Sequence, residues 1–172
     1  MKKMFLTSSF SDVASKLNDF EKDLKGKTIT FIPTASIVEK VIFYVKSGRK
    51  ALEDLGMIID ELEISTATTE EIKNKLEKND YIYITGGNTF FLLQELKRTG
   101  ADKIIIEQVN LCGCDALDLV DFYTIPHCDN FPFKKVADKI IATYSNSLKL
   151  KPINNKQVIL VSDNDIRIET SQ

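Results

Sequence analysis

Two adjacent glycines followed by an asparagine, Gly86-Gly87-Asn88, are the residues of this sequence best suited to chemistry. They come after a short apolar run, Tyr81–Ile84, that predicts a buried strand. They precede apolar residues at helical spacing that stop at Gly100, with Asn88 or Thr89 available as the N-cap of that helix. Such a turn leaves backbone N–H groups free to bind an anion or an acyl-transfer oxyanion. Two glycines are also an ordinary way to leave a strand, so the turn alone favours a purely structural interpretation.

The three cysteines and the single histidine carry the other reactive groups. Cys112, Cys114, His127 and Cys128 are the ligand types of a Cys₃His zinc site. Their C-x-C and adjacent H-C spacings differ from those of zinc knuckles, which have about two to four residues between paired ligands. We therefore favour cysteines that fill a junction as small apolar side chains, and we expect no metal and no other cofactor.

Strands and helices alternate along the first hundred residues, which predicts an α/β fold. Strands are expected at Met4–Leu6, Thr28–Ile32, Met57–Ile64 and Tyr81–Ile84. Two helices are expected between them over Val13–Leu24 and Val38–Leu55. A third helix, which carries Ile72 and Leu76, is expected after a capping box formed by Thr68 and Glu71. This order is typical of a three-layer, mostly parallel sheet with helices on both faces. Ligands bind such sheets beyond the carboxyl ends of the strands, where the glycine turn would lie. Without a linker or repeat, residues 1–172 are expected to form a single domain.

The alternation fails after a further predicted helix, Ala101–Val109, because no buried strand follows it. The chain passes through Asn110–Cys114 to a short predicted strand, Leu119–Phe122, and a loop that holds His127. Pro132 is expected at the first position of a last helix. Two final strands, Gln157–Val161 and Ile166–Glu169, flank a turn of polar residues and predict a C-terminal β-hairpin.

The composition is that of an ordinary soluble protein, with 43% hydrophobic and 28% charged residues among 172 and a net charge of −2. Because the basic residues are scattered, we expect neither nucleic acid nor membrane as a partner. No signal peptide or membrane span is expected. Three cysteines, an odd number, favour a reducing compartment, so a cytoplasmic location is predicted.

Four stretches of the sequence together resemble the dipeptidase E family of serine peptidases, also called aspartyl dipeptidases. They are F-L-T-S-S-F (5–10), F-I-P-T-A-S (31–36), T-G-G-N-T-F-F-L-L-Q-E-L-K-R-T-G-A-D-K (85–103) and D-A-L-D-L-V-D-F-Y-T-I-P-H-C-D-N-F-P-F-K (115–134). The resemblance implies an α/β fold similar to class I glutamine amidotransferases. It also implies, for complete members, cleavage of short peptides after an N-terminal aspartate by a serine, a histidine and an acidic residue.

Position by position, the resemblance implies that Gly86 and Gly87 contribute an oxyanion-hole N–H, with Asn88 beside them, and that His127 is the general base. The family's nucleophile lies in a G-x-S-A-G-A segment between two flanks that are joined here by only five residues, Asn110–Cys114, without a serine. The serine, its strand and helix, and the triad acid are thus predicted to be missing through an internal deletion near 110–114. The alternation of strands and helices fails at the same place.

Three hypotheses about function remain open. The favoured one is a family member that no longer performs the reaction; the second is a hydrolase in which Cys114 pairs with His127. The third is a non-catalytic protein that binds a small acidic ligand or peptide. Loss of an interior strand also requires a repair, either direct pairing of Tyr81–Ile84 with Leu119–Phe122 or a homo-oligomer that covers the gap.

Overall fold

The computed structural model describes residues 2–108 and 119–171. The chain divides into two compact units. One unit, here called the turn unit, is Glu21–Leu117; the other, the histidine unit, is formed by Met1–Phe20 and Asp118–Gln172. That the whole chain forms a single domain stays a prediction.

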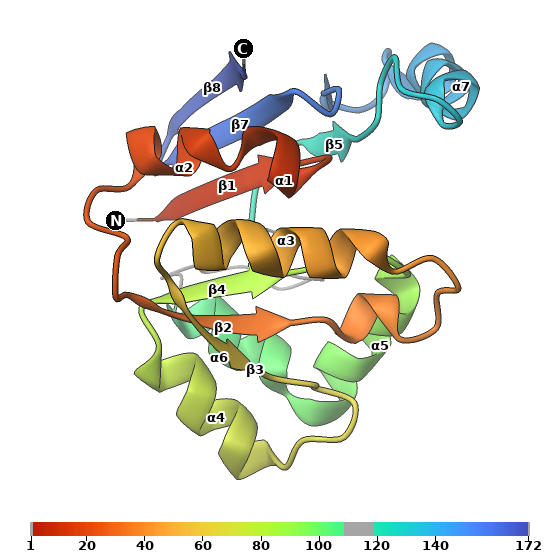
Figure 1. Ribbon diagram of the computed structural model, residues 1–172. Coiled ribbons are helices and arrows are strands. Elements are labelled where there is room, and N and C mark those ends of the chain that lie inside the picture. Colours follow the sequence, from red (N-terminus) through yellow and green to blue (C-terminus); the bar gives the residue numbers. More distant parts are fainter. Residues whose placement is uncertain (1, 109–118, 172) are drawn as a thin grey trace. The chain divides into compact units, whose positions relative to one another are not determined.

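The turn unit contains a parallel three-stranded sheet with the strand order β3-β2-β4. Its elements are β2 (Thr28–Ile32), the 3-10 helix η1 (Thr34–Ser36), α3 (Phe43–Asp54), β3 (Ile58–Glu61), α4 (Thr69–Lys78), β4 (Tyr81–Ile84), α5 (Thr89–Thr99) and α6 (Ala101–Gln108). Helix α3 covers one face of this sheet, and α4, α5 and α6 cover the other (Figure 1). The predicted α/β fold is confirmed, and its three layers are found within this unit.

The alternation of side chains along β4 explains these layers. Tyr83 faces α3, where a Cβ added to Gly48 would lie 2.7 Å from the tyrosine hydroxyl, and its ring stacks on Phe31 with the centroids 5.1 Å apart. Ile82 and Ile84 point to the opposite face. The buried core on that face consists of Ile32, Leu62, Ile64, Ile72, Leu76, Leu96, Ala101 and Ile105.

The histidine unit is built on an antiparallel sheet with the strand order β1-β7-β8, accompanied by a short parallel pair, β5 and β6. Its elements are β1 (Lys3–Thr7), α1 (Phe10–Val13), α2 (Ser15–Phe20), β5 (Tyr123–Ile125), α7 (Lys134–Tyr144), β6 (Leu150–Pro152), β7 (Gln157–Ser162) and β8 (Asp165–Thr170). Strands β7 and β8 form the predicted C-terminal hairpin, in which Ser162 pairs with Asp165. Val13 packs against Val158 and Leu160 on one face of the sheet, whereas Phe122, Ile153, Ile159 and Val161 form a second buried cluster.

Two strand predictions are wrong. The first strand, β1, does not extend the parallel sheet; it pairs antiparallel with β7, Phe5 opposite Leu160. The strand expected at Leu119–Phe122 lies instead at β5, because Leu150–Pro152 provides a parallel partner for Tyr123–Ile125 that the sequence pattern did not reveal. Direct pairing of Leu119–Phe122 with β4, which would join the two units, stays a prediction. The homo-oligomer stays a prediction.

Three helix predictions also differ from the structure. The helix expected over Val13–Leu24 is two short helices that end at Phe20. Helix α3 begins at Phe43 rather than Val38, since the β-branched residues before it are exposed and gain no burial from a helix. Helix α7 begins at Lys134 rather than Pro132, because the preceding residues form a turn in which the carbonyl of Asn130 accepts the N–H groups of Phe133 and Lys134.

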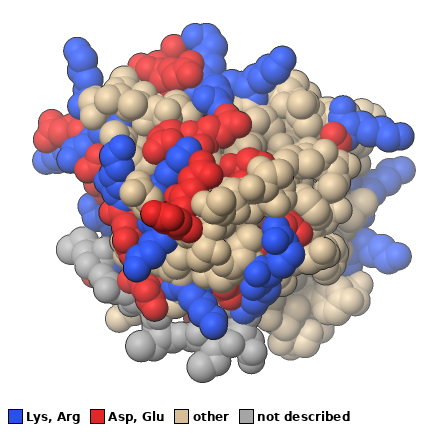
Figure 2. Space-filling model, turned by 90° about the horizontal axis from the view of Figure 1, so that it is seen from below, with Lys and Arg blue, Asp and Glu red and all other residues tan. Residues whose placement is uncertain are grey.

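Acidic and basic side chains are intermingled on the face shown in Figure 2. Ion pairs one helical turn apart include Lys50 with Asp54 and Lys73 with Glu77. Water screens exposed pairs of this kind, so they contribute little to stability. Over the described part of the chain, no helix has the length and apolar character needed to cross a membrane.

Candidate functional site

Gly87 is at the centre of the strand-to-helix turn predicted from the sequence. Its φ angle is +135°, a conformation that side-chain-bearing residues rarely adopt. A Cβ at this position would lie 2.3 Å from the carbonyl oxygen and 2.5 Å from the carbonyl carbon of Ala35, which is itself buried. Gly86 has nothing within 4 Å of an added Cβ. The second glycine is thus required by a close backbone approach to η1, and the first is not.

The turn ends in a capped helix. The N–H of Asn88 donates to Ala35 O at 2.8 Å, and its side-chain oxygen accepts the N–H of Phe91 at 3.0 Å. Helix α5 then runs to Gly100, which adopts the left-handed conformation as C-cap. The predicted strand–glycine turn–helix unit is confirmed, with Asn88 rather than Thr89 as N-cap.

The N–H groups of Gly86 and Gly87 donate to no acceptor within residues 2–108 and 119–171. Both glycines are exposed, as is the side chain of Phe90 in the first turn of α5. Free donors at the N-terminus of an eleven-residue helix suit a carboxylate or an oxyanion. The turn therefore keeps the geometry needed to bind a negative charge.

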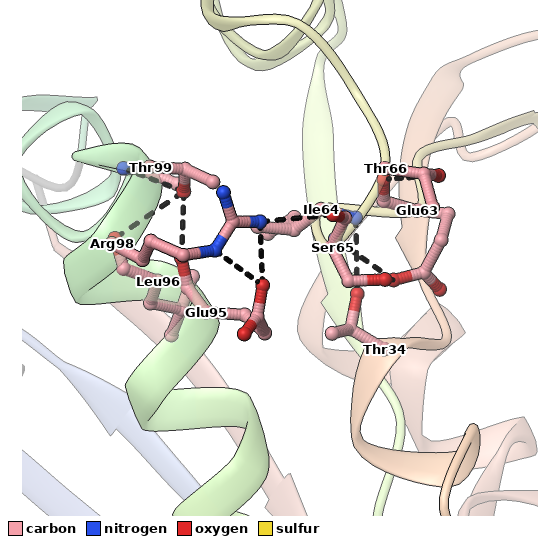
Figure 3. A network of polar contacts seen from close by, with 10 residues as sticks. Thr34, Glu63, Ile64, Ser65, Thr66, Glu95, Leu96, Arg98 and Thr99 are labelled. Carbon is pink, nitrogen blue, oxygen red and sulfur yellow. Dashed lines mark hydrogen bonds and ion pairs between the residues drawn. The ribbon is translucent and has the colours of Figure 1, made fainter.

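A polar network joins α5 to the segment that follows β3, and that segment to η1 (Figure 3). Arg98 donates to Ser65 O at 2.9 Å and through Nε and Nη2 to the Glu95 carboxylate at 2.8 and 2.6 Å. Ser65 in turn donates to Glu63, and Thr34 Oγ1 accepts the N–H of Ile64. Because Glu95 is only 6% exposed, its charge depends on Arg98 for compensation.

His127 lies in the histidine unit, in a loop between β5 and α7 that is held by several hydrogen bonds. Its φ angle is +59°, in the left-handed region that costs a non-glycine residue about 1–2 kcal/mol. The backbone N–H of His127 donates to Ser8 Oγ at 2.9 Å, and the N–H of Cys128 donates to Ile153 O at 3.0 Å. Phe133 stacks on the imidazole with the ring centroids 4.9 Å apart. A strained residue held from several sides is typical of a functional position.

Asn155 contacts the imidazole of His127, and the sequence analysis did not single it out. Its side-chain oxygen lies 2.7 Å from Nδ1 of His127, and its backbone N–H donates to Asn130 Oδ1 at 2.9 Å. The two residues are 28 positions apart, and Asn155 lies in the turn between β6 and β7. No motif in the sequence marks this asparagine, because only the return of the chain through β6 brings it to the histidine.

The cysteines give no second catalytic group within the described residues. Cys128 is half-buried and its thiol donates to Ile125 O at 3.3 Å; burial raises the pKa of this thiol and so opposes formation of a thiolate. Cys112, Cys114 and the junction 110–114 lie outside the described residues. No group of three or more histidine, cysteine or acidic side chains in the described ranges could hold a metal ion.

The structure thus distributes the predicted site residues over both units. Gly86, Gly87 and Asn88 belong to the turn unit and His127 to the histidine unit. Each part has the local geometry that acyl-transfer chemistry uses: donors for an oxyanion in one, and an oriented imidazole in the other.

Comparison with known proteins identifies the class of protein that carries these features. Residues 4–113 match the model of Peptidase family S51. An uncharacterized peptidase of Listeria innocua is 49% identical over 199 residues, which cover 96% of this chain and 95% of the relative. Peptidase E of Haemophilus influenzae is 39% identical over 94 residues, covering 55% of this chain and 41% of the relative. A crystal structure of a candidate peptidase E protein from Listeria monocytogenes EGD-e superimposes with a TM-score of 0.93 at 45% identity, over 100% of both chains.

These matches place the chain among the peptidases. It belongs to peptidase family S51, and the predicted resemblance to dipeptidase E is confirmed. The family match ends at residue 113, inside the junction 110–114. The 199 residues aligned with the Listeria innocua relative exceed the 172 of this chain, so that relative contains residues without a counterpart here.

Proposed function

We propose that this chain is a family S51 protein that no longer hydrolyses the bond after an N-terminal aspartate. The observation that carries the proposal is the junction Asn110–Cys114, which contains no serine where the resemblance places the nucleophile. The end of the family match at residue 113 and the greater length of the alignment with a relative support a deletion at this place.

The residues that remain do not replace a nucleophile. Oxyanion donors such as the N–H groups of Gly86 and Gly87 stabilise an intermediate that forms only after a nucleophile has attacked the carbonyl. A general base such as His127 accelerates the reaction by taking the proton of that nucleophile. Without a serine in the junction Asn110–Cys114, both groups lack the step that they assist.

The test is hydrolysis of Asp-X dipeptides and of an aspartyl chromogenic substrate by the purified chain. The matched control is His127→Ala, which removes the base and leaves the glycine turn unchanged. We expect the two proteins to show the same residual rate. A clear rate in the unaltered chain that is lost in His127→Ala would overturn the proposal.

A second candidate is a thiol hydrolase in which Cys114 pairs with His127. The contact of His127 with Asn155 favours it, because cysteine peptidases of the papain type orient their histidine with an asparagine. In that case the rate would be abolished by thiol alkylation and by Cys114→Ala, and Cys128→Ala would retain it.

A third candidate is a protein that binds a small acidic ligand or peptide without cleaving it. The free N–H groups of Gly86 and Gly87 favour this function, because a carboxylate at the start of α5 would complete their hydrogen bonds. This function is compatible with the absence of hydrolysis. It differs from the first proposal only in that the glycine turn still binds a ligand.

A further inference from the structure

We propose that Asn155 is a positioning residue that holds His127 in the tautomer with the proton on Nδ1, so that Nε2 stays free to accept a proton. The proposal goes beyond the proposed function, because it concerns the orientation of the base alone, and its test requires no substrate and no hydrolysis. Loss of activity and a correctly oriented base are therefore separate results.

The contact between the two side chains sets the tautomer. A carbonyl oxygen has no hydrogen to donate, so Oδ1 of Asn155 at 2.7 Å from Nδ1 requires a proton on that nitrogen. A neutral imidazole carries one N–H, which leaves Nε2 as the acceptor. Nε2 has no partner within the part of the chain that the structure describes. This is the arrangement in which a histidine takes the proton of a nucleophile.

The turn that carries Asn155 is held against the loop that carries His127. Its backbone N–H donates to Asn130 Oδ1 at 2.9 Å, and the N–H of Asn130 donates to His127 O at 3.1 Å. The N–H of Cys128 also donates to Ile153 O at 3.0 Å, so the two loops are joined by a backbone–backbone hydrogen bond as well as by the side chains. The ring of Phe133 covers a face of the imidazole and limits its rotation.

The choice of an amide has a chemical consequence. An aspartate in this place would orient the ring and also stabilise the imidazolium by its charge, whereas asparagine orients the ring only. An asparagine can fail in one specific way: if its NH₂ group faced Nδ1, the proton would move to Nε2 and the base would be blocked. The proposal therefore predicts one tautomer and excludes the other.

The test is a long-range ¹H–¹⁵N correlation spectrum of the imidazole, which reports directly which ring nitrogen carries the proton. Because the chain has a single histidine, every imidazole signal belongs to His127. At a pH where the ring is neutral, we expect a protonated, pyrrole-type Nδ1 and an unprotonated, pyridine-type Nε2. The reverse pattern in the unaltered chain would overturn the proposal.

Three variants separate positioning from folding. Asn155→Ala should shift the two ¹⁵N signals toward the other tautomer, and Asn155→Asp, whose carboxylate can only accept, should preserve the Nδ1–H pattern. Asn154→Ala is the matched control, because it removes a hydrogen bond of the same turn, to the N–H of Lys156, without touching the histidine. Unchanged signals in Asn155→Ala, or a reversed pattern in Asn155→Asp, would contradict the role; if Asn155→Ala does not fold, the unaltered chain and Asn155→Asp still decide.

Discussion

Substitution of Gly87 by alanine tests whether the turn is fixed by its close approach to η1. The new Cβ would lie 2.3 Å from Ala35 O and 2.9 Å from Ser36 N, both buried backbone atoms that cannot rotate away. The unfavourable φ of +135° costs a non-glycine residue about 1–3 kcal/mol. Moving Ala35 would also weaken its hydrogen bond from Asn88, which contributes about 0.5–1.5 kcal/mol. We expect Gly87→Ala to lower the free energy of unfolding by about 2–4 kcal/mol.

The adjacent glycine provides the control. An added Cβ at Gly86 meets nothing within 4 Å, so Gly86→Ala should change the free energy of unfolding by less than about 0.5 kcal/mol. Urea unfolding followed by circular dichroism measures both. Against a total stability of about 5–15 kcal/mol, the difference between the two variants is easily resolved. Equal effects of the two substitutions, or a Gly87→Ala protein as stable as the unaltered chain, would refute the reasoning.

Two further predictions concern the turn unit. Arg98→Ala should lower the free energy of unfolding by about 1–3 kcal/mol, because the buried Glu95 carboxylate loses its partner. In urea unfolding, the double variant Arg98→Ala with Glu95→Gln should recover part of this loss, since it no longer buries an uncompensated charge. No recovery would contradict the role of Arg98 in compensating the charge of Glu95. Hydrogen bonds from the backbone N–H and hydroxyl of Thr28 hold the pKa of Asp80 below its ordinary value. The ionised carboxylate therefore stabilises the fold above about pH 4. This contribution is lost as the pH falls through the lower pKa of the folded state. We expect the urea midpoint to fall on acidification, and to fall less steeply in Asp80→Asn; parallel curves would contradict this prediction.

The local parts of the site could be predicted from the sequence because their signals lie within a few residues. Asn88 and Gly100 delimit α5 as the pattern indicated, and Thr68 accepts the N–H of Glu71 as expected for a cap. The run Tyr81–Ile84 forms β4 with the predicted bounds. In each case the structure depends on a turn, a helix cap or a hydrophobic periodicity, and the residues that form these features are close together in the sequence.

The parts that could not be predicted depend on partners distant in the sequence. Strand β1 runs antiparallel because β7 returns beside it, and no property of Lys3–Thr7 specifies that direction. The contact between His127 and Asn155 depends in the same way on the pairing of β5 with β6. The sequence could therefore indicate which residues carry chemistry, but not which residue orients the histidine.

The initial rate of Asp-X hydrolysis tests most directly whether a family S51 framework persists here without its nucleophile. Peptidase E of Haemophilus influenzae, measured under the same conditions, is a suitable comparator. We predict that this chain releases free aspartate no faster than its own His127→Ala variant. Release at a rate that requires His127 would contradict the claim.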